Sequence, residues 1–205
     1  RELRETQGKL VQSEKLAAIG EVAAHVAHEI RNPLVTIGGF ARSITRQPEK
    51  AERNARHAQI IVEEVSRLEK ILRDLLDFSK PSQPDLRMVV LGPIVESVGE
   101  NLQYADEARG IEVVVRVEPN VPEVLADEKQ VRQILMNLAL NGLQAMAQHG
   151  TLTLGLAHSA GRIDMTVADT GEGIPPERLE RIFDTFYTSK PTGTGLGLAL
   201  CSKLV

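Results

Sequence analysis

The segment HEIRNP, residues 28–33, sets a histidine, a carboxylate and an amide within about two turns of one expected helix. A neutral imidazole is a nucleophile as well as a base, and the neighbouring carboxylate of Glu29 can hold its tautomer and accept its proton. At about 100° per residue, His28 lies opposite the apolar stripe of this helix, and Asn32 lies one turn further along the same outer face. We therefore expect His28 to face solvent. The apolar stripe recurs at steps of three and four and comprises Ile19, Ala23, Val26, Ile30, Leu34, Ile37, Ala41 and Ile44.

An isolated exposed histidine is usually only a surface residue, which is the interpretation favoured for His57, His149 and His158. His28 differs in its neighbours, among them Pro33. A proline inside a helix removes a backbone hydrogen bond and crowds the preceding turn. The helix should therefore be bent or loosened one turn beyond the histidine.

Two asparagines lie four residues apart in the expected helix QILMNLALNGLQAM. Asn137 and Asn141 therefore share one face. Amide carbonyl oxygens suit Mg²⁺, which keeps some waters and takes further ligands from substrate phosphates. Taken alone, such a pair is more often a feature of a solvated helix surface.

The segment VADTGEGIP indicates a strand that ends in Asp169 and turns sharply through Gly171 and Gly173. Glycines there permit a ligand to approach the backbone closely. A carboxylate at a strand end can accept a hydrogen bond from the exocyclic amine at C6 of adenine, where guanine has a carbonyl group. The alternative is a simple turn in which the aspartate is a local cap.

The segment KPTGTGLGL places Gly193, Gly195 and Gly197 before an apolar helix. Backbone N–H groups at a helix N-terminus can bind an anion. This is not a P-loop, because no Lys-Ser or Lys-Thr follows the last glycine.

The first eighty residues carry no strand signal, and Pro48 separates two long apolar periodicities. This pattern predicts a helical hairpin over residues 17–79, preceded by a connector helix at 1–16. The seam of the second arm comprises Ala58, Ile61, Val65, Leu68, Leu72 and Leu75. Two helices alone cannot cover two such seams, so we expect a homodimer with a four-helix bundle.

A segment rich in proline and polar residues, 80–88, predicts a linker. β-branched alternating segments and helical segments follow over residues 89–205. They predict an α/β sandwich with helices on one face of a mixed sheet.

The composition narrows the class of protein. The formal net charge of −4 argues weakly against nucleic acid, and one cysteine excludes an internal disulfide framework. Cys201 lies among apolar residues and is expected in the core. No membrane-spanning stretch or secretory signal is visible, so a cytoplasmic location is expected, with a membrane segment upstream of Arg1 left open.

Together these motifs, in this order, resemble the sensor histidine kinases of two-component signalling. HEIRNP looks like the phosphoacceptor motif, NLALNG the asparagine box, DTGEGIP the first glycine box, RIFDTFYTSK the phenylalanine box and GTGLGL the second glycine box. The resemblance implies a dimerisation and phosphotransfer hairpin joined to a Bergerat-type ATP-binding domain. FYTSKPTGTGLGL is most similar to the nitrogen-regulatory type of kinase.

The resemblance also implies roles for individual residues. It makes His28 the phosphoacceptor, Glu29 its acid/base partner, Asn141 a Mg²⁺ ligand, Asp169 the adenine reader and Lys190 a contact of the terminal phosphate. ATP and Mg²⁺ are the implied cofactors. The other implied nucleotide-binding positions are Asn137, Gly171, Gly173, Phe183, Phe186, Thr194, Gly195, Leu196 and Gly197, and the segment from Phe183 to Thr194 is expected to form a mobile lid within residues 176–195.

Related ATPases that hydrolyse ATP typically carry glutamate at the position of Asn137. An amide cannot serve as a base that activates water, so the γ-phosphoryl group should be preserved for His28. The implied partners are a response regulator receiver domain and an upstream sensor domain. Asn32 is expected to support removal of phosphate from that regulator, because kinases of this motif class often carry asparagine or threonine there as the phosphatase determinant. Alternatively, Asn32 only precedes the proline.

The family continues beyond the second glycine box with the rest of a helix and two more strands, whereas this sequence stops at Val205. Either further residues follow Val205 in the protein or the ATP-binding domain is incomplete, and we expect the former. Two other classes of protein remain as alternatives: a catalytically silent dimeric adaptor, and a gyrase-like hydrolase. The intact acceptor, magnesium and adenine residues argue against the adaptor, and Asn137 and the histidine hairpin argue against the hydrolase. The stimulus, the identity of the regulator, and transfer within a chain or across the dimer are left open.

Overall fold

The computed structural model describes residues 26–79, 84–105, 108–146, 148–190 and 193–205. The chain divides into two compact units, Arg1–Ser79 and Lys80–Val205, which we call the hairpin and the ATP unit. The predicted connector at residues 1–16, together with Ile19 and Ala23 of the predicted stripe, lies outside the described residues. None of the described helices has the length and apolar character needed to cross a membrane.

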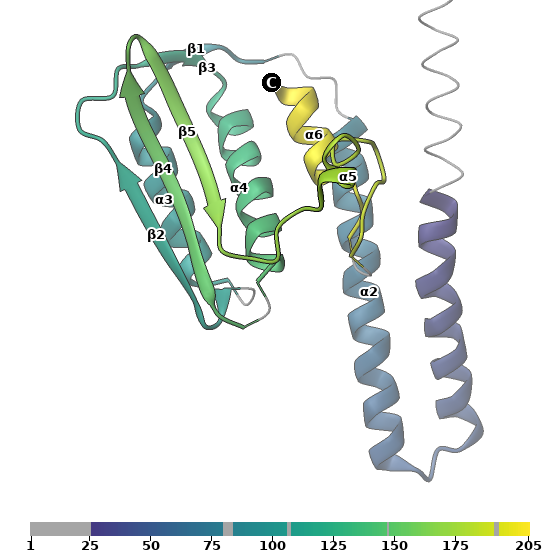
Figure 1. The fold of residues 1–205 in the computed structure, drawn as a ribbon. Coiled ribbons are helices and arrows are strands. Elements are labelled where there is room, and N and C mark those ends of the chain that lie inside the picture. Colours follow the sequence, from purple (N-terminus) through teal and green to yellow (C-terminus); the bar gives the residue numbers. More distant parts are fainter. Residues whose placement is uncertain (1–25, 80–83, 106–107, 147, 191–192) are drawn as a thin grey trace, which may run out of the picture. The chain divides into compact units, whose positions relative to one another are not determined.

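The hairpin consists of a first helix over residues 26–46, a turn over 47–50 and helix α2, Ala51–Ser79 (Figure 1). Side chains of α2 close the turn: the guanidinium group of Arg53 donates to the side chain of Gln47, and Asn54 Nδ2 donates to the Gln47 carbonyl oxygen at 2.9 Å. The predicted break at Pro48 is therefore confirmed. At Pro33 the helix continues without interruption and the proline ring is buried, so any loosening there does not end the helix.

One hairpin leaves much of its apolar surface in water. Ile71 is its buried aliphatic side chain, at 4% exposure. Leu34, a member of the predicted stripe, is 53% exposed. The other large apolar side chains exposed on the described part of the hairpin are Val35, Val62, Val65, Leu72 and Leu76.

The described residues of the ATP unit form two sheets. In the larger one, β4 (Gly150–Ser159) pairs in parallel with β2 (Ile111–Val117) and antiparallel with β5 (Arg162–Asp169), so the sheet is mixed, as predicted. The smaller sheet pairs β1 (Arg87–Val89) with β3 (Val124–Ala126). The predicted linker at 80–88 is thus too long at its end, because Arg87 and Met88 already pair with β3.

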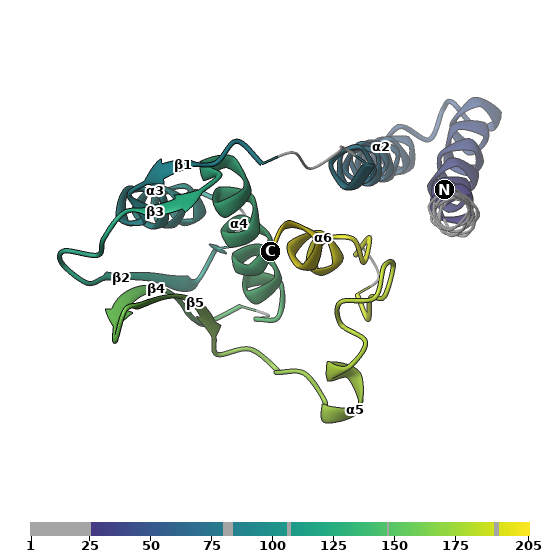
Figure 2. The ribbon, with the colours of Figure 1, turned by 90° about the horizontal axis from the view of Figure 1, so that it is seen from above.

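The helices of this unit are α3 (Leu91–Gln103), α4 (Glu128–Gln144), the short α5 (Pro176–Leu179) and α6 (Gly197–Leu204). Helices α3 and α4 cover one face of the larger sheet, as Figure 2 shows from above. Strand β4 supplies that face with every second residue, because side chains alternate along a strand. The fully buried leucines and valines between helices and strand are Val95, Val98, Leu102, Leu135, Leu143, Leu152, Leu154 and Leu156.

Helix α4 begins with a capped N-terminus. Asp127 Oδ1 accepts from the backbone N–H groups of Lys129 and Gln130 at 2.8 and 3.2 Å, and its Oδ2 accepts from the N–H of Asp85 at 2.9 Å. The N–H of Asp85, followed by that of Gln130, lowers the pKa of the Asp127 carboxyl from its ordinary value. The cap fixes the start of the helix that carries both asparagines.

Candidate active site

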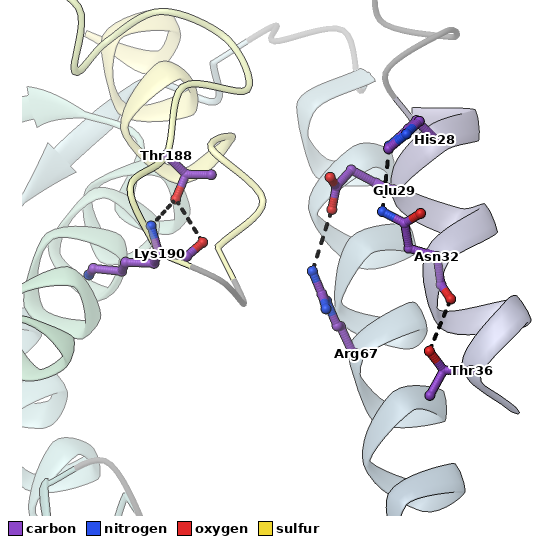
Figure 3. Close-up of polar contacts among 7 residues, drawn as sticks. All are labelled: His28, Glu29, Asn32, Thr36, Arg67, Thr188 and Lys190. Atoms are coloured by element: carbon purple, nitrogen blue, oxygen red, sulfur yellow. Dashed lines mark hydrogen bonds and ion pairs between the residues drawn. The ribbon is translucent and has the colours of Figure 1, made fainter. Parts of the chain in front are cut away.

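His28 and Asn32 lie together on the exposed outer face of the first hairpin helix. Asn32 Nδ2 lies 3.5 Å from His28 Nδ1, the longest separation that still allows a weak hydrogen bond (Figure 3). The predicted exposure of His28 and the shared face are therefore confirmed. The Asn32 carbonyl oxygen accepts from Thr36 Oγ1 at 3.3 Å.

Glu29 is half-buried and turns toward the second helix of the hairpin rather than outward (Figure 3). Its Oε2 lies 3.6 Å from Nη2 of Arg67 on α2. The carboxylate that the sequence assigns to His28 is therefore in contact with a cation from the other helix.

Both asparagines of α4 lie on the side of the helix that receives α6. Asn137 Nδ2 donates to the carbonyl oxygen of Gly197 at 3.4 Å, so this amide ties the start of α6 to α4. A side-chain atom added at Gly197 would lie 3.9 Å from Asn141 Nδ2. Cys201, from the next turn of α6, is buried as predicted, and burial raises the pKa of its thiol.

Asp169 is the last residue of β5, and its pairing with β4 decides to which face of the sheet its side chain points. It pairs with the buried Leu152, so its side chain points to the face of the sheet that α4 covers. A Cβ atom at Gly142 of α4 would lie 3.2 Å from Asp169 Cβ and 2.9 Å from Leu152, so glycine is what lets the strand end lie this close to the helix. Asp169 Oδ1 accepts from the N–H of Gly171 at 2.8 Å, which leaves Oδ2 available to a ligand.

The first glycine box runs against the end of α4. The N–H of Glu172 donates to the Ala145 carbonyl oxygen at 3.2 Å, and a Cβ at Gly171 would lie 2.7 Å from that oxygen. The loop therefore fits only with glycine at this contact. Gly173 lies in the same turn with a φ of 72°.

Lys190 lies far from α4 in the sequence, but its positively charged ammonium group contacts this helix. Its Nζ donates to the backbone carbonyl of Asn141 and to Gln144 Oε1, each at 3.2 Å. Its backbone N–H donates to Thr188 Oγ1 at 3.1 Å (Figure 3). The ammonium group thus lies beside the residue proposed to bind magnesium.

The phenylalanine box is not a packed core element. Phe183 is 51% exposed, whereas Phe186 is half-buried and has a φ of 67°. The N–H of Phe186 donates to the carbonyl of Gly195 at 3.0 Å, and a Cβ at Gly195 would lie 2.4 Å from the Phe186 carbonyl carbon. These contacts hold Phe186, which belongs to the expected lid, against Gly195. Thr194 is half-buried, and Leu196 is buried, so Leu196 can meet a nucleotide only through its backbone.

These positions fit a magnesium nucleotide. Three separate segments approach the second half of α4: the end of β5 with the first glycine box that continues from it, Lys190, and the start of α6. Asn141 offers a half-buried amide oxygen there, which is the hard oxygen ligand that Mg²⁺ accepts beside phosphates and water. Gly142 leaves the space beside Asp169 without a side chain.

Three contacting residues were not predicted from the sequence. Arg67, Gln144 and Thr188 belong to polar surface patterns that resemble any solvated helix or loop. For Arg67 the sequence offers one signal, its position next to Leu68 on the edge of the α2 seam. Counting residues in both directions from Pro48 would place Arg67 near Glu29.

Two family models match the chain. Residues 18–84 match the His Kinase A (phospho-acceptor) domain, and residues 126–205 match the histidine kinase-, DNA gyrase B- and HSP90-like ATPase family. The sensor histidine kinase ZraS of Escherichia coli O157:H7 is 35% identical over 199 residues, which is 97% of this chain and 43% of ZraS. The chain thus spans less than half the length of this relative.

Solved structures agree with these matches. The histidine kinase ThkA in complex with the response regulator protein TrrA gives a TM-score of 0.78 at 29% identity, covering 100% of this chain and 60% of that one. Full-length ShkA in complex with AMPPNP gives 0.63 at 31% identity, covering 90% and 40%. The expected fold class, a helical hairpin followed by an α/β ATP-binding domain, is confirmed, whereas the likeness to the nitrogen-regulatory type stays a prediction. With an acceptor hairpin and an ATPase-type domain matched in this order, the chain belongs to the sensor histidine kinases of two-component systems.

Proposed function

We propose that the chain uses ATP to phosphorylate His28 and passes the phosphoryl group to an aspartate of a response regulator. The observation that carries the proposal is the convergence of Asn141, Asp169 and Lys190 on one half of α4, in a chain that also holds an exposed histidine beside a carboxylate. The structures of ShkA in complex with AMPPNP and of ThkA in complex with TrrA support the two ligand classes.

In the proposed reaction, an imidazole nitrogen of His28 attacks the γ-phosphorus as the bond to the ADP oxygen breaks. The proton on the other ring nitrogen passes to Glu29. Asp169 holds the adenine amine through its remaining oxygen, and Lys190 brings positive charge to the terminal phosphate. Catalysis rests on positioning and charge neutralisation, because Asn137 cannot activate water.

Asn141 is the residue proposed to hold Mg²⁺. When bound, the ion neutralises charge on the phosphates and orients them. The predicted roles of Gly171, Gly173, Thr194, Gly195 and Gly197 are to bring backbone N–H groups close to the nucleotide.

The chain acts as a homodimer in this proposal, because a second hairpin would cover the apolar side chains that one hairpin exposes. The match to the phospho-acceptor family supports dimerisation. The domain boundaries given above, apart from the end of the linker, stay predictions, as do an upstream sensor domain and a cytoplasmic location.

Labelling with γ-labelled ATP tests the kinase proposal. The chain should acquire label that is labile in acid and stable in base, and His28→Gln should bind ATP normally yet carry no label. His158→Gln, at another exposed histidine, is the matched control and should label like the wild type. Steady ATP turnover without phosphoprotein would instead favour a hydrolase.

We further propose that Asn32 supports dephosphorylation of the response regulator. It lies on the same exposed face as His28, so a receiver docked for phosphotransfer brings its phospho-aspartate near the amide, which can orient a water molecule. Asn32→Ala should lower regulator dephosphorylation at least about tenfold, roughly 1.4 kcal/mol of transition-state stabilisation, while autophosphorylation and forward transfer survive. Parallel loss of both activities would return Asn32 to a structural role beside Pro33.

A further inference from the structure

The carboxylate of Glu29 is engaged across the hairpin. Its Oε2 lies 3.6 Å from Arg67 Nη2, and both side chains retain only about a quarter of their exposure, 25% and 27%. At this distance the two groups attract each other as charges without an ordinary hydrogen bond. The attraction draws the Glu29 side chain toward Arg67 without fixing it there by an ordinary hydrogen bond.

The imidazole of His28 has a different neighbour. Its Nδ1 lies 3.5 Å from the amide of Asn32, on the outer face of the helix. Consecutive residues on a helix point about 100° apart, so Glu29 must turn away from Arg67 before its carboxylate can take a proton from His28. In the arrangement of Figure 3, Asn32 is paired with His28 and Glu29 is paired with Arg67.

We propose that Arg67 is a positioning residue that holds Glu29 away from His28 and thereby limits autophosphorylation. The inference rests on the proposed role of Glu29 as proton acceptor. With Glu29 held, the residue beside His28 is Asn32, the one proposed for dephosphorylation. Arg67 thus biases the hairpin toward phosphatase activity and away from kinase activity.

The position of the pair gives this bias a means of control. Glu29 belongs to the first hairpin helix and Arg67 to α2, so sliding or rotation of one helix against the other changes the distance between the charges. An input that moves the helices would release Glu29 without touching His28. The arrangements of the hairpin that favour kinase and phosphatase activity need differ by only a small free energy. A ligand or a movement shifts the balance between them by as much as it stabilises one arrangement more than the other.

The test measures initial rates of His28 labelling in the full chain. Arg67→Gln removes the charge, and Arg67→Met keeps the aliphatic stem for packing. Both should raise the maximal labelling rate about two- to fivefold, the range that a partly exposed ion pair can bias, with the KM for ATP unchanged. Arg67→Lys keeps a cation and should stay near the wild-type rate, and regulator dephosphorylation should fall relative to labelling in the Gln and Met variants.

Arg73→Gln is the matched control. Arg73 also forms an ion pair on α2, with Glu69 at 3.7 Å, but both side chains are more than 60% exposed and the pair lies within one helix. Its loss should leave labelling unchanged. A labelling rate at or below that of the wild type in folded Arg67→Gln or Arg67→Met would overturn the inference. A raised rate would support it, because general damage to the hairpin does not raise a rate.

A double variant separates this inference from the proposed function. Glu29→Gln alone should label slowly, and adding Arg67→Gln should change nothing further, because Arg67 acts through Glu29. An equal rise in both backgrounds would overturn the inference while leaving the kinase assignment intact. Absence of label on His28 in the wild type would instead overturn the proposed function.

Discussion

The hairpin and the ATP unit differ in how far each buries its own apolar side chains. In the described residues of the hairpin, Ile71 is buried while Leu34, Val62, Val65 and Leu72 lie 42–58% exposed. The ATP unit closes a continuous core between α3, α4 and the larger sheet. From this contrast we infer that the part carrying His28 needs a second chain to cover its apolar side chains, whereas the ATP unit holds a core of its own.

Replacing two exposed apolar residues of α2 tests this contrast most strongly. Val65→Asp with Leu72→Asp should raise the dissociation constant of the dimer at least about a hundredfold, because each dimer would bury four unpaired carboxylates. The thermal transition of the ATP unit should not move. Sedimentation and calorimetry check both expectations.

Leu125→Asp is the control in the other unit. Leu125 is 64% exposed on β3, so it is a comparable apolar residue outside the hairpin, and its replacement should leave the dimer intact. If this variant dissociated the dimer as well, or if the α2 variant did not, the proposed division between the two units would fail.

The nucleotide site of the ATP unit gives the next largest effect. Asn141→Ala should weaken magnesium-dependent ATP binding at least about tenfold, because it removes a hard oxygen ligand from the proposed site. Gln133→Ala, two turns earlier on α4, is the control and should bind normally. Titration calorimetry with and without Mg²⁺ separates loss of the ion from loss of the fold, and unchanged affinity in Asn141→Ala would remove this residue from the metal site.

A smaller effect is expected where Lys190 meets α4. Gln144→Ala removes a hydrogen-bond acceptor of the ammonium group, so amide exchange at Thr188, Ser189 and Lys190 should accelerate about two- to tenfold. The exposed Gln148 provides a matched Gln→Ala control. Hydrogen exchange over residues 176–195 with added ATP also tests the predicted lid, and exchange that does not change with nucleotide would contradict it.

The smallest effect concerns the cap of α4. The folded pKa of Asp127 is lowered, so its contribution to stability is complete above the unfolded pKa and is lost as pH falls through the folded value. Asp127→Ala should therefore lower the Tm of the ATP unit near neutral pH, and the difference from wild type should shrink below about pH 4. Asp127→Asn keeps the capping oxygen and should show a smaller deficit at neutral pH. A deficit that does not change with pH would assign the effect to packing alone.

Local periodicity was enough to predict what lies within one element. The helical repeat placed His28 and Asn32 on one outer face, and the alternating, β-branched segments predicted strands in the second unit, β4 among them. Periodicity could not predict contacts between elements, such as Lys190 with Gln144, because polar surface residues carry no periodic signal. For Glu29 with Arg67, only a residue count from Pro48 gives an indication. The three-residue strands β1 and β3 were missed because so short a run has no measurable alternation, and β1 therefore fell inside the predicted linker.

The parallel pairing of β2 with β4 also constrains the order in which the chain folds during synthesis. Ile111 has its partner in Gly150, so β2 leaves the ribosome well before the strand that completes it, and α4 must be made in between. Non-local parallel pairing is slow because the entropy cost of closing a long loop must be met before contacts between the strands can offset it. The β2 backbone and the valines Val113 and Val115 stay open to other chains during this interval, which makes nascent β2 the segment at which crowded expression should first produce aggregates.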